Sequence, residues 1–188
     1  MESFQVELGS CRGDIFQHLT LPSLTILQVV DSLYCDHPQL RRFISRSRPA
    51  ITHLLLSSST FSHEEVVATL ALLPTITQLK LEGGLFQEWD PESMDGFLHR
   101  MTAGPELAED FLLPNLMDLS LHFITQVKGR IGDVISMLES RRLAAHGLRQ
   151  RLAVLRLIFW EASGSEEKLV RQRINVLRDG LDAQVMFI

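Results

Sequence analysis

The chain has no long apolar run and no leader-like start. No segment of its 188 residues approaches the roughly 20 consecutive apolar residues that a membrane-spanning helix needs. The first residues, Met1–Phe4, lack the basic flank and apolar stretch of a signal peptide. We therefore expect a protein without membrane spans that resides inside the cell, in the cytoplasm or the nucleus.

Cysteine is scarce, because the chain contains only Cys11 and Cys35. Their separation matches neither a zinc-binding pair nor a redox motif. Two free, buried thiols in a reducing compartment are the expected state, which again favours an intracellular location.

Motifs of familiar enzymes are also missing. His63–Glu65 does not extend to H-E-x-x-H, and Gly83-Gly84 lacks the lysine and the helix start of a phosphate-binding loop. The acidic cluster Glu88–Asp95 has no late glutamate of a calcium loop, and no G-x-S-x-G elbow occurs. The sequence therefore predicts no catalytic residues, no metal and no cofactor, and favours a non-enzymatic protein.

What the chain does contain is a repeated leucine pattern, h-x-x-h-x-h, in which h is an apolar residue and x is any residue. Alternating apolar residues in such a short segment point to one face of a β-strand. The five copies are Leu24–Val29, Ile51–Leu56, Ile76–Leu81, Leu116–Leu121 and Leu152–Leu157.

Proline marks the entry to most of these strands. Leu21-Pro22, Leu73-Pro74 and Leu113-Pro114 precede three copies, and Pro49 precedes a fourth. Proline disfavours helix at the preceding residue and lacks an N–H, so each pair is expected to end a helix just before a strand.

The pattern resembles the leucine-rich repeat in an irregular form. The copies begin 27, 25, 40 and 36 residues apart, against about 20–29 residues in leucine-rich repeats. The usual Asn or Cys after the last leucine is absent, so the turns must be stabilised differently; its positions hold Ser32, Ser59, Gly84, Ile124 and Trp160.

Helices are predicted between the strands. The clearest start is Ser62–Glu65, which matches a capping box. Phe4, Val6 and Leu8 favour a first edge strand, and Val185–Ile188 a last one. Residues expected to face the core from the helices are Ile15, Phe16, Leu19, Leu40, Phe43, Ile44, Val66, Leu70, Leu73, Met94, Phe97, Leu98, Met101, Ile131, Val134, Ile135, Leu138, Val170, Ile174 and Leu177.

Charge is distributed unevenly. The formal net charge is −5, with acidic residues in excess up to residue 127 and basic residues in excess after it. We expect the arginines of this basic part to lie on solvated helix faces, and nucleic-acid binding is not expected because no aromatic residues are interleaved with them. They are Arg141, Arg142, Arg149, Arg151, Arg171, Arg173 and Arg178.

The residues between the repeat leucines point to the opposite face of the sheet, which a partner protein could contact. An ordinary solvated sheet face explains the same residues equally well. The candidate partner-binding residues are Gln28, His53, Ser57, Gln78, Lys80, Glu82, Asp118, Ser120, His122 and Arg156.

The chain resembles the carboxy-terminal leucine-rich-repeat-like region of fungal F-box proteins. The segments that carry the resemblance are Leu40–Ser47, Leu72–Pro74, Leu112–Leu116, Ile135–Arg141 and Gly180–Asp182. The resemblance implies a repeat region that recruits substrates to a cullin–RING ubiquitin ligase. No F-box-like segment precedes the repeats, so any link to the ligase is expected to be indirect.

Together these features predict a single α/β domain over residues 1–188, a right-handed, irregular leucine-rich-repeat-like solenoid of five to six helix–strand repeats with parallel strands. The expected function is protein–protein interaction, as the substrate-recognition region of an F-box-type ligase subunit. The alternative is a stand-alone leucine-rich-repeat scaffold with no link to ubiquitin.

Overall fold

The structure is a computed structural model that describes residues 2–8, 15–31, 37–57, 62–82, 91–102, 111–123, 131–143, 151–159, 164–177 and 180–187. Its strands are β1 (Glu2–Leu8), β2 (Leu24–Asp31), β3 (His53–Ser57), β4 (Gln78–Glu82), β5 (Asp118–Phe123), β6 (Val154–Phe159) and β7 (Asp182–Phe187). Its helices are α1 (Ile15–His18), α2 (His37–Ser47), α3 (His63–Ala71), α4 (Pro91–Met101), α5 (Ile131–Leu143) and α6 (Gly164–Val176).

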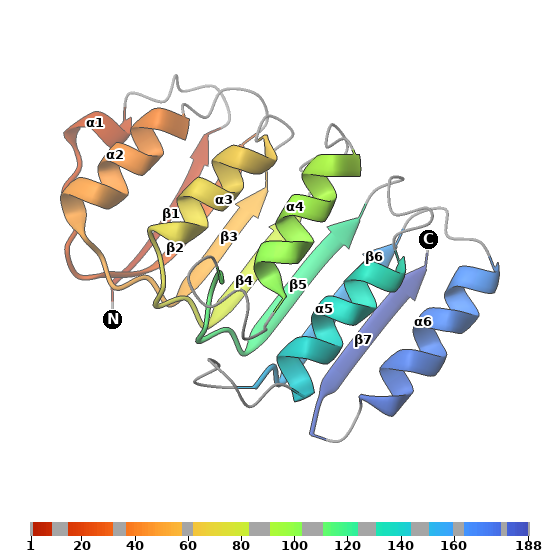
Figure 1. Ribbon diagram of the computed structural model, residues 1–188. Helices are drawn as coiled ribbons and strands as arrows, with labels where there is room; N and C mark the ends of the chain where they lie inside the picture. Colours follow the sequence, from red (N-terminus) through yellow and green to blue (C-terminus); the bar gives the residue numbers. More distant parts are fainter. Residues whose placement is uncertain are drawn as a thin grey trace.

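The strands form one parallel sheet in the order β1-β2-β3-β4-β5-β6-β7, so neighbours in the chain are neighbours in the sheet. All the helices cover the same face (Figure 1). Each unit rises along a strand, descends along a helix in front of it and moves one strand to the right, which is the right-handed crossover that parallel strands favour. The predicted α/β repeat solenoid is therefore confirmed.

Two rows of aliphatic side chains run across the sheet beneath the helices. Parallel pairing places one residue of each repeat directly beside its equivalent in the next. All members of both rows are at most 2% exposed, so they form the continuous core that a stack of repeats requires. The rows are Leu27, Leu54, Leu79, Leu119 and Leu155, and Val29, Leu56, Leu81, Leu121 and Leu157.

The Leu-Pro pairs form tight turns at the entry to the strands. The carbonyl oxygen of Leu73 accepts from the Ile76 N–H at 3.2 Å, and that of Leu113 accepts from Leu116 at the same distance. Proline thus occupies the second turn position, for which its fixed φ suits it. The turn also buries the first apolar residue of the repeat, such as Ile76, just before the strand begins.

Threonines link the first repeats at this same entry edge. The Thr52 N–H and hydroxyl both donate to the Thr25 carbonyl, at 2.9 and 3.2 Å, and Thr77 donates in the same way to Thr52, at 2.8 and 3.2 Å. In the later repeats only the backbone bond is present. The Met117 N–H donates to the Thr77 carbonyl and the Ala153 N–H donates to the Met117 carbonyl, both at 2.8 Å. The positions that hold Asn or Cys in regular repeats lie outside the described residues.

Most of the helix predictions are confirmed. The Glu65 N–H donates to the Ser62 hydroxyl at 3.3 Å and the Ser62 N–H donates to the Glu65 carboxylate at 3.1 Å, which completes the capping box. Ile15 was expected inside but is 40% exposed, because the single turn of α1 turns only Phe16 into the core. The last strand begins at Asp182, earlier than predicted. Cys11 and Cys35 lie outside the described residues.

The prediction for one arginine is wrong. Arg141, expected on a solvated helix face, is 1% exposed. Its guanidinium donates to the backbone carbonyls of Met101 at 2.6 Å, Leu112 at 2.6 Å and Leu113 at 3.1 Å. It also lies over the Phe111 ring, 4.7 Å from the centroid. Burial lowers the pKa of Arg141 to about 9, which leaves the side chain charged at neutral pH.

This contact holds together the longest repeat. Met101 ends α4, where unpaired carbonyls carry partial negative charge. Leu113 has a φ of +56°, in the left-handed region that costs a non-glycine residue roughly 1–2 kcal/mol. A single cation thus joins the end of α4 to the carbonyls of Leu112 and Leu113, which precede β5 in the chain. Arg46 makes a similar but only partly buried contact from the last turn of α2 to the Phe16 carbonyl, at 2.6 Å.

We expect Arg141→Met to lower the free energy of unfolding by about 3 kcal/mol, because buried carbonyls lose their donors and a positive-φ residue loses its anchor. The matched control is Arg42→Met on the exposed surface of α2, which we expect to change stability by at most about 0.5 kcal/mol. Urea unfolding of both variants makes the comparison. Equal stability of the two would show that Arg141 does not hold the repeat.

Candidate functional site

The sheet face opposite the helices carries all the candidate partner-binding residues. Alternation along each strand places them there, because their neighbours in the chain enter the two buried rows. Register arranges them in three cross-strand rows that we name by their position along the strands. The entry row is Ile26, His53, Gln78, Asp118 and Val154; the middle row is Gln28, Leu55, Lys80, Ser120 and Arg156; the exit row is Val30, Ser57, Glu82, His122 and Ile158.

An ion pair connects β5 and β6 across this face. Arg156 Nη1 donates to both carboxylate oxygens of Asp118, at 2.9 and 3.1 Å. The two residues lie diagonally, since Arg156 is registered with Ser120. Half-buried Asp118 is thereby fixed while the arginine retains part of its exposure.

A second charged group lies at the exit row. Lys80 Nζ is 2.7 Å from Glu82 Oε2, and the same oxygen is 3.6 Å from His122 Nδ1. Burial lowers the pKa of His122 below its usual 6.5; Glu82 opposes this shift and Lys80 adds to it. At neutral pH His122 is therefore uncharged, and Glu82 is shared between a cation and a neutral imidazole.

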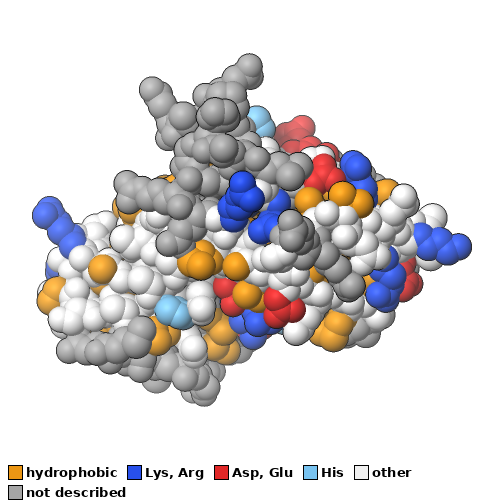
Figure 2. All heavy atoms as spheres, turned by 90° about the horizontal axis from the view of Figure 1, so that it is seen from below, with side chains coloured by type: hydrophobic (Ala, Val, Ile, Leu, Met, Phe, Trp, Pro, Cys, Tyr) orange, Lys and Arg blue, Asp and Glu red, His pale blue; other side chains and the backbone are white. Residues whose placement is uncertain are grey.

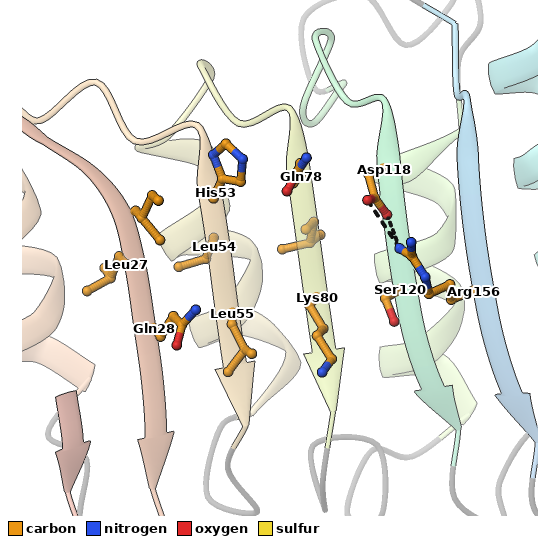
Figure 3. Close-up of a pocket in the computed structure, with 12 residues that line it drawn as sticks. Leu27, Gln28, His53, Leu54, Leu55, Gln78, Lys80, Asp118, Ser120 and Arg156 are labelled. Carbon is orange, nitrogen blue, oxygen red and sulfur yellow. Dashed lines mark hydrogen bonds and ion pairs between the residues drawn. The ribbon is translucent and has the colours of Figure 1, made fainter. Parts of the chain in front are cut away.

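A shallow hollow of about 360 Å³ opens in the entry and middle rows. The residues that line it come from the neighbouring strands β2 to β6, and Figure 3 shows the Arg156 side chain reaching from β6 toward Asp118 on β5. Of the predicted residues, Gln28, His53, Gln78, Lys80, Asp118, Ser120 and Arg156 line the hollow. Ser57, Glu82 and His122 belong to the exit row and do not line it.

Ser120 differs from the expectation of an exposed contact residue. It is only 4% exposed, because its short side chain lies between the longer Lys80 and Arg156 in the middle row. The residue therefore forms part of the floor of the hollow rather than its rim.

Apolar residues of the hollow were not among the predicted site residues. Ile26 and Leu55 line it beside the polar groups. Every helix of the described chain lies on the other face of the sheet, so no described helix covers these apolar residues (Figure 1). The signal available in the sequence was their position between the repeat leucines, which assigns them to the open face.

The basic residues of the second half do not gather into one free patch among the described residues. Arg141 is buried, Arg171 pairs with Glu167 at 2.8 Å and Arg173 with Glu139 at 3.5 Å. Seen from below, acidic and basic side chains lie next to one another (Figure 2). Arg149 and Arg178 are outside the described residues.

Similarity to known proteins does not identify the site. The sequence matches no protein-family model and no curated protein. Within the described ranges, no three His, Cys, Asp or Glu side chains come together as metal ligands. No described helix combines the length and apolar character needed to cross a bilayer.

The opposing effects on His122 can be tested directly. We expect an NMR titration to give a pKa below 6.5 in the parent chain, a lower value in Glu82→Gln, which removes an attractive charge, and a higher value in Lys80→Gln, which removes a repulsive one. Because protonation is disfavoured in the folded state, stability should fall as the pH drops below 6.5. A higher pKa of His122 in Glu82→Gln, or a lower one in Lys80→Gln, would contradict this arrangement.

Proposed function

We propose that this protein binds other proteins through the open face of its sheet. The observation that supports the proposal is a hollow lined by ion-paired and amide side chains on a face that no described helix covers. Stacked repeats commonly use such extended faces for recognition. Polar groups whose positions are fixed by register provide specificity, and the apolar side chains of Ile26 and Leu55 provide area to bury.

The more specific proposal is that the chain is the substrate-recognition repeat region of an F-box-type ubiquitin-ligase subunit. The support is its resemblance, over several helix–strand junctions, to the repeat region of fungal F-box proteins. In this role the open face would hold the client, and the ligase would be reached indirectly. The alternative is a scaffold of the same fold with no ubiquitin link.

The binding face can be tested by photo-crosslinking in the source cells. A benzoylphenylalanine at Gln78, exposed in the hollow, should crosslink to a partner protein, whereas one at Lys168, exposed on α6, should not. Filling the hollow with Gln78→Trp should weaken binding of that partner at least about tenfold, and Lys168→Trp should leave it unchanged.

The crosslinked complex also separates the two candidate functions. Cullin and adaptor subunits that co-purify with the partner support the ligase role, and a partner recovered without them supports the scaffold. A partner that crosslinks equally from Gln78 and Lys168, and binds Gln78→Trp normally, would refute the open face as the binding surface.

A further inference from the structure

The floor of the hollow contains a hydroxyl group without a partner. Ser120 is buried, lines the hollow and makes no hydrogen bond in the part of the chain that the structure describes. The side-chain oxygen of Ser120 is not among the fully buried, unpaired polar atoms of the described residues, so it can be reached from solvent. The Ser120 hydroxyl is therefore available to a group that enters the hollow.

Arg156, next to Ser120, retains unused donors. Both oxygens of Asp118 are bound by Nη1 alone. Neither Nε nor Nη2 of Arg156 has a hydrogen-bond partner among the described residues. These two groups form the parallel fork of the guanidinium that matches the two oxygens of a carboxylate.

Two cations, Lys80 and Arg156, and one carboxylate, Asp118, line the hollow, and Glu82 lies beside it in the exit row. The side chains of Lys80 and Arg156 are 44% and 43% exposed, whereas those of Glu82 and Asp118 are 23% and 20% exposed. Each carboxylate is already bound by a cation. Lys80 lies on the far side of Ser120, ~10 Å from Arg156 across two strand spacings, and attracts negative charge to the same place.

We propose that the hollow receives an aspartate or glutamate side chain of the partner protein. The Arg156 fork donates two hydrogen bonds to this carboxylate and the Ser120 hydroxyl donates a third, while Ile26 and Leu55 contact an adjacent apolar side chain of the same segment. This assignment rests on the proposed function, because it specifies what the open face recognises.

A single carboxylate fits this hollow better than a phosphate group. One free guanidinium fork and one lysine face the site, and the nearby carboxylates of Asp118 and Glu82 would repel a dianion more strongly than a monoanion. No phenylalanine, tyrosine or tryptophan for stacking nucleic-acid bases is among the described residues that line it.

The test uses random peptides displayed on phage and selected against the purified full chain. Peptides whose binding is abolished by Gln78→Trp are retained, so only ligands of the hollow are analysed. We expect them to carry a shared Asp or Glu beside an apolar residue. Replacing that acid with its amide should raise the Kd, measured by fluorescence anisotropy, about tenfold or more.

Variants of the protein should change its affinity for the selected peptide in opposite directions. Arg156→Lys keeps the charge but removes the fork, and should weaken binding of the selected acidic peptide about tenfold. Ser120→Ala removes the hydroxyl and should weaken this binding several-fold. Asp118→Asn removes a competing negative charge and should strengthen it. Arg42→Gln, an exposed arginine on α2, is the matched control and should have no effect.

The outcomes distinguish this inference from the proposed function. Peptides that bind the hollow without a shared acid, or that bind Arg156→Lys as well as the parent chain, overturn the carboxylate site and leave the protein-binding face intact. A hollow that binds a phosphate group more tightly than a carboxylate in the same peptide also overturns it. If no selected peptide depends on Gln78, both the site and the open face as a peptide-binding surface are refuted.

Discussion

The side-by-side register of the aliphatic rows is the constraint on which the rest of the structure depends. Leu79 can be buried only if Leu54 and Leu119 lie directly beside it on the neighbouring strands. The same register fixes the opposite face, since every residue between two buried leucines must point away from the helices. The open face and its hollow are thus a geometric consequence of the core.

This coupling explains why side chains distant in the sequence form specific contacts. Asp118 and Arg156 are separated by a whole helix–strand unit, yet the pairing of β5 with β6 brings them within 2.9 Å. Glu82 meets His122 in the same manner. The candidate site therefore needs no special loop, and its residues are held by the paired strands of the sheet.

Periodicity in the sequence was sufficient to predict the alternation of strands and helices and which residues of the repeat strands face the core, but not the exposure of Ile15 or the burial of Arg141. The capping box at Ser62 is a local signal and was predicted correctly. The Leu-Pro pairs were expected to end helices, whereas Leu113-Pro114 forms a turn well after α4 ends at Met101. The pairing of Arg156 with Asp118, the hollow itself and the burial of Ser120 depend on which strands are adjacent and on side-chain length, and neither follows from a local pattern. Arg141 shows the limit most clearly: its carbonyl partners lie 28 to 40 residues away, so its helix position alone resembled that of a surface arginine.

The burial of Arg141 has a consequence for how this fold can change in evolution. Its guanidinium fixes Met101 and Leu112 relative to each other, independently of the residues that connect them. Insertions or deletions in that connecting stretch would leave both anchor points, and hence the alignment of β4 with β5, in place. The long repeat is therefore a position where new sequence can be accommodated without disturbing the stack.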